Sequence, residues 1–253
     1  MNTREVILRE IGLTPIWTTR HPTSDAQVTA PAQSPLAVHA AVSETAIINE
    51  VSAPHSEVTG VVSTDRAAAI AQMSWDQLTE SIATCTACKL CKTRTTTVPG
   101  VGDRSPAWMV IGEAPGENED KTGEPFVGKA GQLLDAMLAA IGKKRGDGVY
   151  IANVIKCRPP GNRNPEPDEI AACEPYLKRQ IALAQPKLLL AAGKFSAQTL
   201  LHSDDTVGAM RARGGTYDSI PVVVTYHPSY LLRSPLEKAK AWDDLMKARA
   251  LVP

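Results

Sequence analysis

The sequence predicts an α/β domain in which helices pack on a mainly parallel sheet. From about residue 75 onward, short apolar runs alternate with amphipathic segments that have helical spacing. Loops rich in Gly and Pro follow several of these runs. Hydrophobic residues make up 43% of the 253 residues and charged residues 21%, so the chain can form one sizeable core, or one domain with a tail.

Four strands are expected from apolar, often β-branched runs that are bounded by Gly, Pro or charged residues. They lie at 107–111, 149–155, 187–192 and 220–226. The first of them ends at Gly112. Ligands of such sheets bind outside the carboxyl ends of the strands, where this chain places the motifs GEAPG, NVIKCRPP and YHPSYLLR.

Five helices are expected around these strands, from apolar residues at helical spacing and from end signals. They cover 75–83, 129–141, 168–183, 196–201 and 235–250. The first leads into a group of cysteines, the second ends at Gly142, and the third follows a Pro-rich loop. Because helices commonly form the crossovers between parallel strands, this order supports the α/β assignment.

The N-terminal part of the chain differs from this body. Residues 21–64 contain no Lys, Arg, Phe, Trp or Tyr, and their Ala, Pro and Ser content predicts a disordered acidic linker. Residues 1–20 contain a short apolar helical pattern that either docks on a protein partner or folds back on the body. The folded domain is therefore expected over 65–253.

The chain shows no signal for a membrane or for secretion. Its longest unbroken apolar run, Ala136–Ile141, has six residues, which is too short to cross a membrane. The first residues carry charges of both signs and no apolar core of a signal peptide. We therefore expect a cytoplasmic protein without membrane contact, and we expect it to be a monomer.

The net charge of zero conceals an uneven distribution. Residues 1–84 carry 4 Lys and Arg against 9 Asp and Glu, whereas residues 85–253 carry 23 against 18. A polyanionic partner for the basic body therefore stays open. A small positive excess of this size is also ordinary for a folded domain.

The five cysteines favour a metal site over disulfides. They are Cys85, Cys88, Cys91, Cys157 and Cys173. Without a secretory signal, structural disulfides are disfavoured. The first two together with the last two would supply four thiolates for zinc or for an iron–sulfur cluster, and spacing alone does not choose between these metals. Scattered free thiols are the remaining alternative.

Three features near the expected sheet edge could contact a ligand. The Gly112–Gly116 loop lacks the Lys and Ser/Thr of a phosphate-binding loop and precedes several carboxylates, so a neutral base fits it better than a nucleoside triphosphate. Phe126 lies in a Gly/Pro-rich loop, where it is either anchored in the core or a stacking platform for a base. His227 follows a strand and is either structural or functional.

Three long motifs occur in order: GEAPGENEDKTGEPFVGKAGQLL, NVIKCRPPGNRNPEPDE and HPSYLLR. With the cysteine pairs, they resemble the family 4 uracil-DNA glycosylases, the iron–sulfur members of the uracil-DNA glycosylase superfamily. The resemblance runs from about Cys85 to the C-terminus and does not cover 1–64. It implies a three-layer α/β/α fold with a central four-stranded, mainly parallel sheet. It also implies a [4Fe–4S] cluster held by Cys85, Cys88, Cys157 and Cys173, with no counterpart for Cys91.

The resemblance further implies that the protein binds uracil-containing DNA, flips the uracil out and hydrolyses its N-glycosidic bond. His227 would face the uracil carbonyl at position 2, and Asn153 would contact N3–H and O4. Phe126 would stack on the ring. Glu119 would lie beside C5 and exclude the methyl group of thymine.

Two positions in the GEAPG loop complete the expected site, and the first of them, Ala114, is expected to bind the uracil. Ala114 stands where family 1 enzymes have a catalytic Asp, so the family 1 mechanism does not transfer directly. Glu113 is the nearest carboxylate. We expect it to position water or to balance positive charge on the sugar.

DNA contacts are expected after the last strand and in the cysteine-bearing loop. Leu231 or Leu232 is expected to replace the flipped base, and Arg233 to contact a phosphate. Further contacts with the DNA backbone are expected from three basic residues: Lys156, Arg158 and Arg163.

Two other functions stay open. The chain could be a non-catalytic iron–sulfur protein of the same fold that binds DNA or accompanies replication, although its Asn153, Phe126 and His227 argue against this. It could also be a covalent uracil-binding relative. Those proteins carry a basic, His-containing insertion after the second strand, and 157–165 contains no His.

Overall fold

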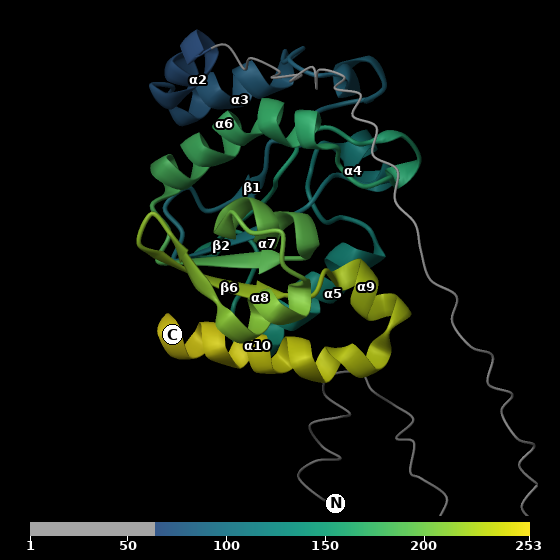
Figure 1. Ribbon diagram of the computed structural model, residues 1–253, viewed down its shortest axis with the longest axis vertical. Coiled ribbons are helices and arrows are strands. Elements are labelled where there is room, and N and C mark those ends of the chain that lie inside the picture. The colour runs from purple at the N-terminus through teal and green to yellow at the C-terminus, as the bar shows by residue number, and fades with distance from the viewer. Residues whose placement is uncertain (1–63) are drawn as a thin grey trace, which may run out of the picture. The chain divides into compact units, whose positions relative to one another are not determined.

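The computed structural model describes residues 64–253 (Figure 1). The helix expected within 1–20 and the linker expected over 21–64 lie outside these residues, except for Thr64. Helix α2 (Thr64–Ala71) opens the described part, one residue before the expected start of the domain. Among the helices of this part, none is both long and apolar enough to cross a membrane.

A six-stranded sheet in the order β1-β3-β2-β4-β6-β5 forms the centre. Its middle consists of four parallel strands: β2 (Trp108–Gly112), β3 (Val149–Asn153), β4 (Leu188–Ala192) and β6 (Ile220–Thr225). These are the four strands predicted from sequence. The short antiparallel edge strands β1 (Val101–Gly102) and β5 (Gly215–Tyr217) were not predicted, because two or three residues carry no readable periodicity.

Helices cover both faces of this sheet (Figure 1). Alternate side chains of β2 enter two separate cores, with Met109 and Ile111 on one face and Trp108 and Val110 on the other. The first core includes side chains of α2, α3 (Trp75–Ala83), α6 (Pro167–Ala184), α7 (Lys194–Leu201) and α8 (Val207–Arg213). The second includes α5 (Lys129–Ala140) and α10 (Lys238–Leu251). The predicted three-layer α/β/α fold is confirmed.

Several short helices lie where the sequence predicted loops. They are η1 (Lys89–Lys92), α4 (Glu117–Thr122), η2 (Pro160–Asn162) and α9 (Pro228–Arg233). Each of these has six residues or fewer, so apolar spacing cannot reveal it. The helix predicted over 235–250 begins as the 3-10 turn η3 (Pro235–Glu237) and continues as α10. Helices α4 and α9 matter most, because both begin at the carboxyl edge of the sheet.

The strand predicted at 149–155 is shorter than expected. Its ladder ends at Asn153, which pairs with Gly112 of β2. The next two N–H groups, of Val154 and Ile155, donate to the carbonyls of Gly112 (2.9 Å) and Glu113 (3.2 Å) in the loop that follows β2. The end of β3 is thereby joined to the GEAPG loop.

Candidate functional site

Asn153, Phe126 and Gly112 meet at the carboxyl edge of the sheet. A Cβ built on Gly112 would lie 2.4 Å from Asn153 Oδ1 and 2.5 Å from Phe126 Cζ, so only glycine permits this approach. Asn153 is 2% exposed, and its Oδ1 has no hydrogen-bond partner within the described residues. A buried, unpaired acceptor is costly unless a ligand supplies a donor. The position therefore suits a ligand with an N–H group.

Phe126 is held in a conformation that is unusual for a bulky residue. Its φ of 56° lies in the left-handed region. Arg145 donates to the carbonyls of Pro125 (2.6 Å) and Phe126 (2.8 Å), while helix α5 approaches at Gly131, where a Cβ would meet the Phe126 oxygen at 1.7 Å. Backbone strain of this kind persists where the surroundings over-determine it, and it gathers at functional sites.

The Phe126 ring is buried, at 6% exposed, but it faces the site rather than only the core. It stacks with the imidazole of His227, with ring centroids 5.5 Å apart and an angle of 28° between the planes. Both roles considered for Phe126 are therefore compatible with its position, because the residue also belongs to the second core.

His227 is the N-cap of α9, and this fixes its tautomer. The backbone N–H of Ser229 donates to Nδ1 at 3.1 Å, so Nδ1 carries no proton. Burial, with a smaller effect from Arg233, lowers the pKa of His227 to about 4, against the opposing charge of Glu119. At neutral pH the imidazole is therefore uncharged, and Nε2 carries its proton as a donor.

Glu113, which follows β2, lies beside His227 and contacts the start of α7. Its Oε1 accepts a hydrogen bond from the backbone N–H of Phe195 at 3.0 Å. A Cβ built on Gly193 would lie 2.5 Å from Glu113 Oε1 and 3.1 Å from His227 Cβ, so the absence of a side chain at Gly193 keeps these two residues together. Burial raises the pKa of Glu113, and the N–H groups at the start of α7 oppose that rise.

Glu119 joins the start of α4 to the loop that contains Phe126. One carboxylate oxygen accepts from Gly116 N–H (3.1 Å), and the other accepts from Val127 N–H (2.9 Å) and Gly128 N–H (3.1 Å). These bonds fix the loop of Phe126 against the start of α4. Ala114, between β2 and α4, is half-buried and packs on the first core.

Helix α9 presents its two leucines differently. Leu231 is 0% exposed and packs in the interior, whereas Leu232 is 42% exposed. Arg233 is also exposed. Of the two leucines, Leu232 can therefore contact a partner without leaving a packed core.

Of the three basic residues expected on DNA, Lys156 is buried, and the DNA contact expected of it is wrong for this reason. Its ammonium instead binds Asn153 O (2.6 Å) and Gln180 Oε1 (2.7 Å). Arg158 donates to Asn162 Oδ1 at 2.8 Å and lies 3.7 Å from a Glu117 oxygen.

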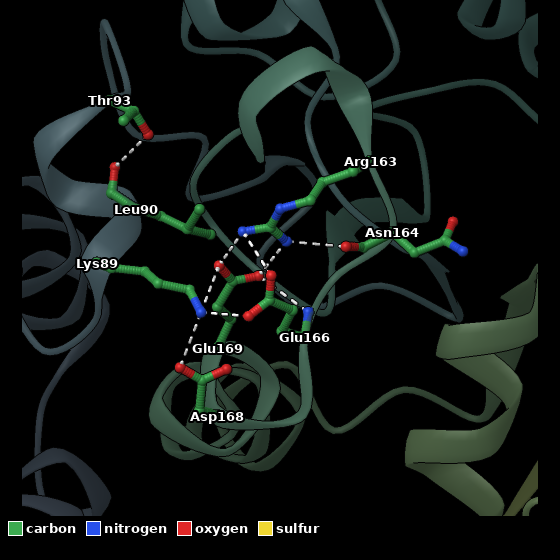
Figure 2. A network of polar contacts seen from close by, with 8 residues as sticks. All are labelled: Lys89, Leu90, Thr93, Arg163, Asn164, Glu166, Asp168 and Glu169. Atoms are coloured by element: carbon green, nitrogen blue, oxygen red, sulfur yellow. Dashed lines mark hydrogen bonds and ion pairs between the residues drawn. The ribbon is translucent and has the colours of Figure 1, made fainter.

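Arg163 belongs to an ion-pair network that links the first cysteines to α6. Figure 2 shows Arg163 and Lys89 reaching the carboxylates of Glu166 and Glu169 at the start of that helix. The Arg163 guanidinium binds Glu169 through two bonds of 2.6 and 2.9 Å. Glu169 is fully buried, so this pair anchors the loop after Cys157; whether Arg163 also contacts DNA stays a prediction.

Four of the five thiols share one cavity. Cys85, Cys88, Cys157 and Cys173 line it, and Cys91 does not. Arg94 donates to Cys157 Sγ (3.2 Å), Lys156 N–H to Cys173 Sγ (3.3 Å), and Arg66 Nη2 approaches Cys85 Sγ (3.7 Å). Within residues 64–253, no three His, Cys, Asp or Glu side chains converge on a point that could hold a single metal ion.

Several residues that build the site were not predicted from sequence. Ser229 selects the His227 tautomer, Arg145 clamps the Phe126 loop, and Gln180 pairs with Lys156. The contact of Ser229 with His227 had a local signal. Pro is common at the first position of a helix, so a residue followed by Pro is a candidate N-cap. Arg145 and Gln180 had none, because their partners are 19 and 24 residues away in the chain.

His227 predicts a loss of stability in acid. Its folded pKa of about 4 lies below the ordinary value of 6.5, so the unfolded chain binds the proton more tightly. This contribution to stability is complete above about pH 6.5 and is lost as the pH falls toward about 4. The free energy of unfolding in urea, measured across this range, should fall less steeply for His227→Gln than for the natural protein. Parallel curves would contradict the assignment.

The comparisons with known proteins agree with this geometry. Residues 99–246 match the family model of the uracil DNA glycosylase superfamily. The type-4 uracil-DNA glycosylase of Archaeoglobus fulgidus is 41% identical over 182 residues, which cover 69% of this chain and 91% of that protein. The type-4 enzymes of Sulfurisphaera tokodaii (42% over 186 residues, 70% and 84% covered) and Thermotoga maritima (41% over 180 residues, 69% and 93% covered) are similar to the same extent. The chain therefore belongs to the uracil-DNA glycosylase superfamily, and within it to the type-4 uracil-DNA glycosylases.

Proposed function

We propose that this protein excises uracil from DNA, and that the pocket of Asn153, Phe126 and His227 receives the flipped base. The observation that carries the proposal is the buried Asn153 Oδ1 without a partner within the described residues, close to the ring of Phe126. Uracil offers an N3–H donor for that oxygen and an O4 acceptor for the amide nitrogen. Cytosine lacks the donor at N3 and has an amino group at position 4, so it would leave this amide mismatched.

His227 acts on the departing base. Uracil leaves as an anion while the sugar takes on positive charge, as in other glycosyl transfers. A neutral imidazole that carries its proton on Nε2 donates a hydrogen bond to the oxygen on which the negative charge develops. Because Ser229 and burial maintain this tautomer before the substrate arrives, no reorganisation is needed during the reaction.

Glu113 acts on the sugar side. Its carboxylate is anchored at the start of α7 next to His227, which supports a role in orienting the attacking water or in balancing the charge on the sugar. Glu119, with Ala114 in the same wall, shapes the pocket edge that would reject the methyl group of thymine. Its three backbone contacts would make this wall rigid.

The exposed part of α9 would bind DNA. Leu232 is the side chain that would fill the gap left by the flipped base, since Leu231 is held in the interior. Arg233, one residue further, would contact a phosphate. The non-catalytic alternative is not favoured, because the relatives that match most of this chain are type-4 uracil-DNA glycosylases.

The four thiols that share a cavity support a [4Fe–4S] cluster held by Cys85, Cys88, Cys157 and Cys173. Four cysteine thiolates are the usual ligand set of such a cluster, and these four residues would hold it through their sulfur atoms. Burial raises the pKa of Cys173 to about 12, so binding of iron there must release a proton. When bound, the cluster would cross-link the segment after α3 to the loop after β3. The expected monomeric state, cytoplasmic location and protein partner of residues 1–20 stay predictions.

An oligonucleotide with a single uracil tests the proposed function. Incubation with the protein should leave an abasic site, which hot alkali converts to a strand break that a sequencing gel resolves. The same oligonucleotide with thymine should stay intact. Absence of alkali-sensitive breaks with uracil would contradict the proposal.

Asn153→Asp should reduce the discrimination between uracil and cytosine. A protonated carboxyl can donate to N3 of cytosine, which the natural amide oxygen cannot do, so slow cytosine excision should appear while uracil excision falls. Single-turnover rates on uracil and cytosine oligonucleotides measure the ratio. Asn164→Asp makes the same change at an exposed position and should leave the ratio unaltered. An unchanged ratio in Asn153→Asp would mean that this residue does not read the base.

His227→Ala and Arg233→Ala should fail in different ways. The oxyanion exists only as the bond breaks, so loss of its donor should lower the single-turnover rate at saturating enzyme by about 10²–10³ with little change in DNA affinity. Loss of a phosphate contact should instead weaken binding and flatten its salt dependence. A normal saturated rate for His227→Ala would rule out its role in the chemical step.

The purified protein should be yellow-brown, with a broad absorbance band near about 400 nm from charge transfer between thiolate and iron. Cys157→Ala should lose the colour and the bound iron, whereas Cys91→Ala should keep both. Iron content per chain and the absorbance spectrum measure this. Equal loss in both variants would refute the ligand assignment, and zinc in place of iron would refute the cluster.

A further inference from the structure

Lys156 is a fully buried lysine with no carboxylate beside it. It is 1% exposed and takes part in none of the ion pairs formed by residues 64–253. Its ammonium donates to the carbonyl of Asn153 (2.6 Å) and to Gln180 Oε1 (2.7 Å). A buried charge without an opposite charge nearby is costly, so the position calls for a compensating anion.

The groups that can supply that negative charge are the thiols of the shared cavity. Lys156 lines this cavity, and the next residue in the chain is Cys157. The backbone N–H of Lys156 donates to Cys173 Sγ at 3.3 Å. Arg94 and Arg66 contact two further edges of the same cavity through Cys157 and Cys85. Two guanidinium groups and the backbone N–H of Lys156 thus contact three of the four thiols, and the lysine itself lines their cavity. This arrangement fits a metal-bound thiolate group with a net negative charge.

On its other side, Lys156 satisfies the backbone of the base-reading residue. Asn153 is the last residue of β3, and its buried carbonyl lies beyond the ladder with the edge strand β1, whose last pair toward Asn153 is Val101 with Ile151. The ammonium supplies the donor for this carbonyl. Gln180 braces the ammonium in turn, because its Nε2 donates to Pro99 O (2.6 Å) and lies 3.3 Å from the Tyr150 hydroxyl.

We propose that Lys156 is a positioning residue that couples the thiolate-bound metal site to uracil recognition. Its charge is balanced by the metal-bound thiolates, and its ammonium sets the backbone position from which the Asn153 amide meets the base. The inference rests on the proposed function. Since coupling between two sites is reciprocal, a base bound at Asn153 must also stabilise the metal site.

The test measures iron release in the holoprotein. The probe is an oligonucleotide with one 2′-fluoro-deoxyuridine, whose fluorine slows bond cleavage by disfavouring positive charge on the sugar, so that the base stays bound. The control oligonucleotide carries thymine. In the natural protein, the uracil analogue should slow iron release to a ferrous chelator by about five-fold or more relative to thymine.

Lys156→Met keeps an unbranched apolar side chain that is one atom shorter, and it removes the charge and the donors. In this variant, iron release should be faster and should no longer respond to the uracil analogue, and the ratio of uracil to cytosine excision should fall. Lys178→Met is the matched control, because Lys178 lies on the same helix as Gln180 but pairs with Glu174 at the surface. It should behave like the natural protein in all three measurements.

Preserved protection of iron by the uracil analogue in Lys156→Met would overturn the coupling, and so would an unchanged base ratio. If Lys156→Met does not fold, Gln180→Leu carries the test, since it removes one of the two partners of the ammonium and should reduce the protection in the same direction. Full protection in Gln180→Leu would also overturn it. A natural protein that leaves uracil in DNA would instead refute the proposed function, so the two failures are distinguishable.

Discussion

The structure of the site depends on the requirement that buried polar groups be paired. Five residues, 153–157, run from the end of a central strand to a thiol of the cysteine cavity, and several of their polar groups have partners. Val154 and Ile155 donate to the neighbouring loop, and Lys156 binds Asn153, Gln180 and Cys173. The Asn153 side-chain oxygen has no partner within the described residues. Because the hydrogen bonds around it hold the backbone, the Asn153 amide cannot turn at low cost to accommodate a mismatched ligand. Its unpaired oxygen therefore selects ligands that carry a donor.

The same principle accounts for how the loops are built. Glu119 uses both oxygens on backbone N–H groups, and Arg145 uses its guanidinium on two backbone carbonyls. Two charged side chains therefore hold loop backbones that lie outside the strands and helices. Gly112, Gly131 and Gly193 then let these loops approach more closely than a Cβ would permit. Rigid placement of this kind is what preorganised catalysis requires, since the groups that stabilise the transition state must be in position before it forms.

Sequence patterns predicted the four central strands and the main helices, because each has enough residues to show an apolar period. They did not predict α4, α9 or the edge strands, since these are short and are held by caps and tertiary contacts. The motifs led correctly to the strand mouth, where Asn153, Phe126 and His227 lie together. They could not distinguish Leu231 from Leu232, and they misplaced Lys156, because burial depends on how a helix or loop packs. A lysine in a basic loop looks like a DNA contact until its ammonium is found pointing inward at Asn153 and Gln180.

A neutral histidine suits this chemistry better than a charged one. An imidazolium in the pocket would attract the uracil anion more strongly, but it would also have to remain charged in a buried site beside the exposed Arg233, and that arginine lowers its pKa further. It would repel the positive charge that develops on the sugar as well. A neutral Nε2–H donor stabilises the departing oxygen without either cost, and Ser229 ensures that the proton lies on that nitrogen. The helix that we propose to present Leu232 and Arg233 to DNA therefore also sets, through its N-cap, the tautomer of the histidine proposed to act on the base.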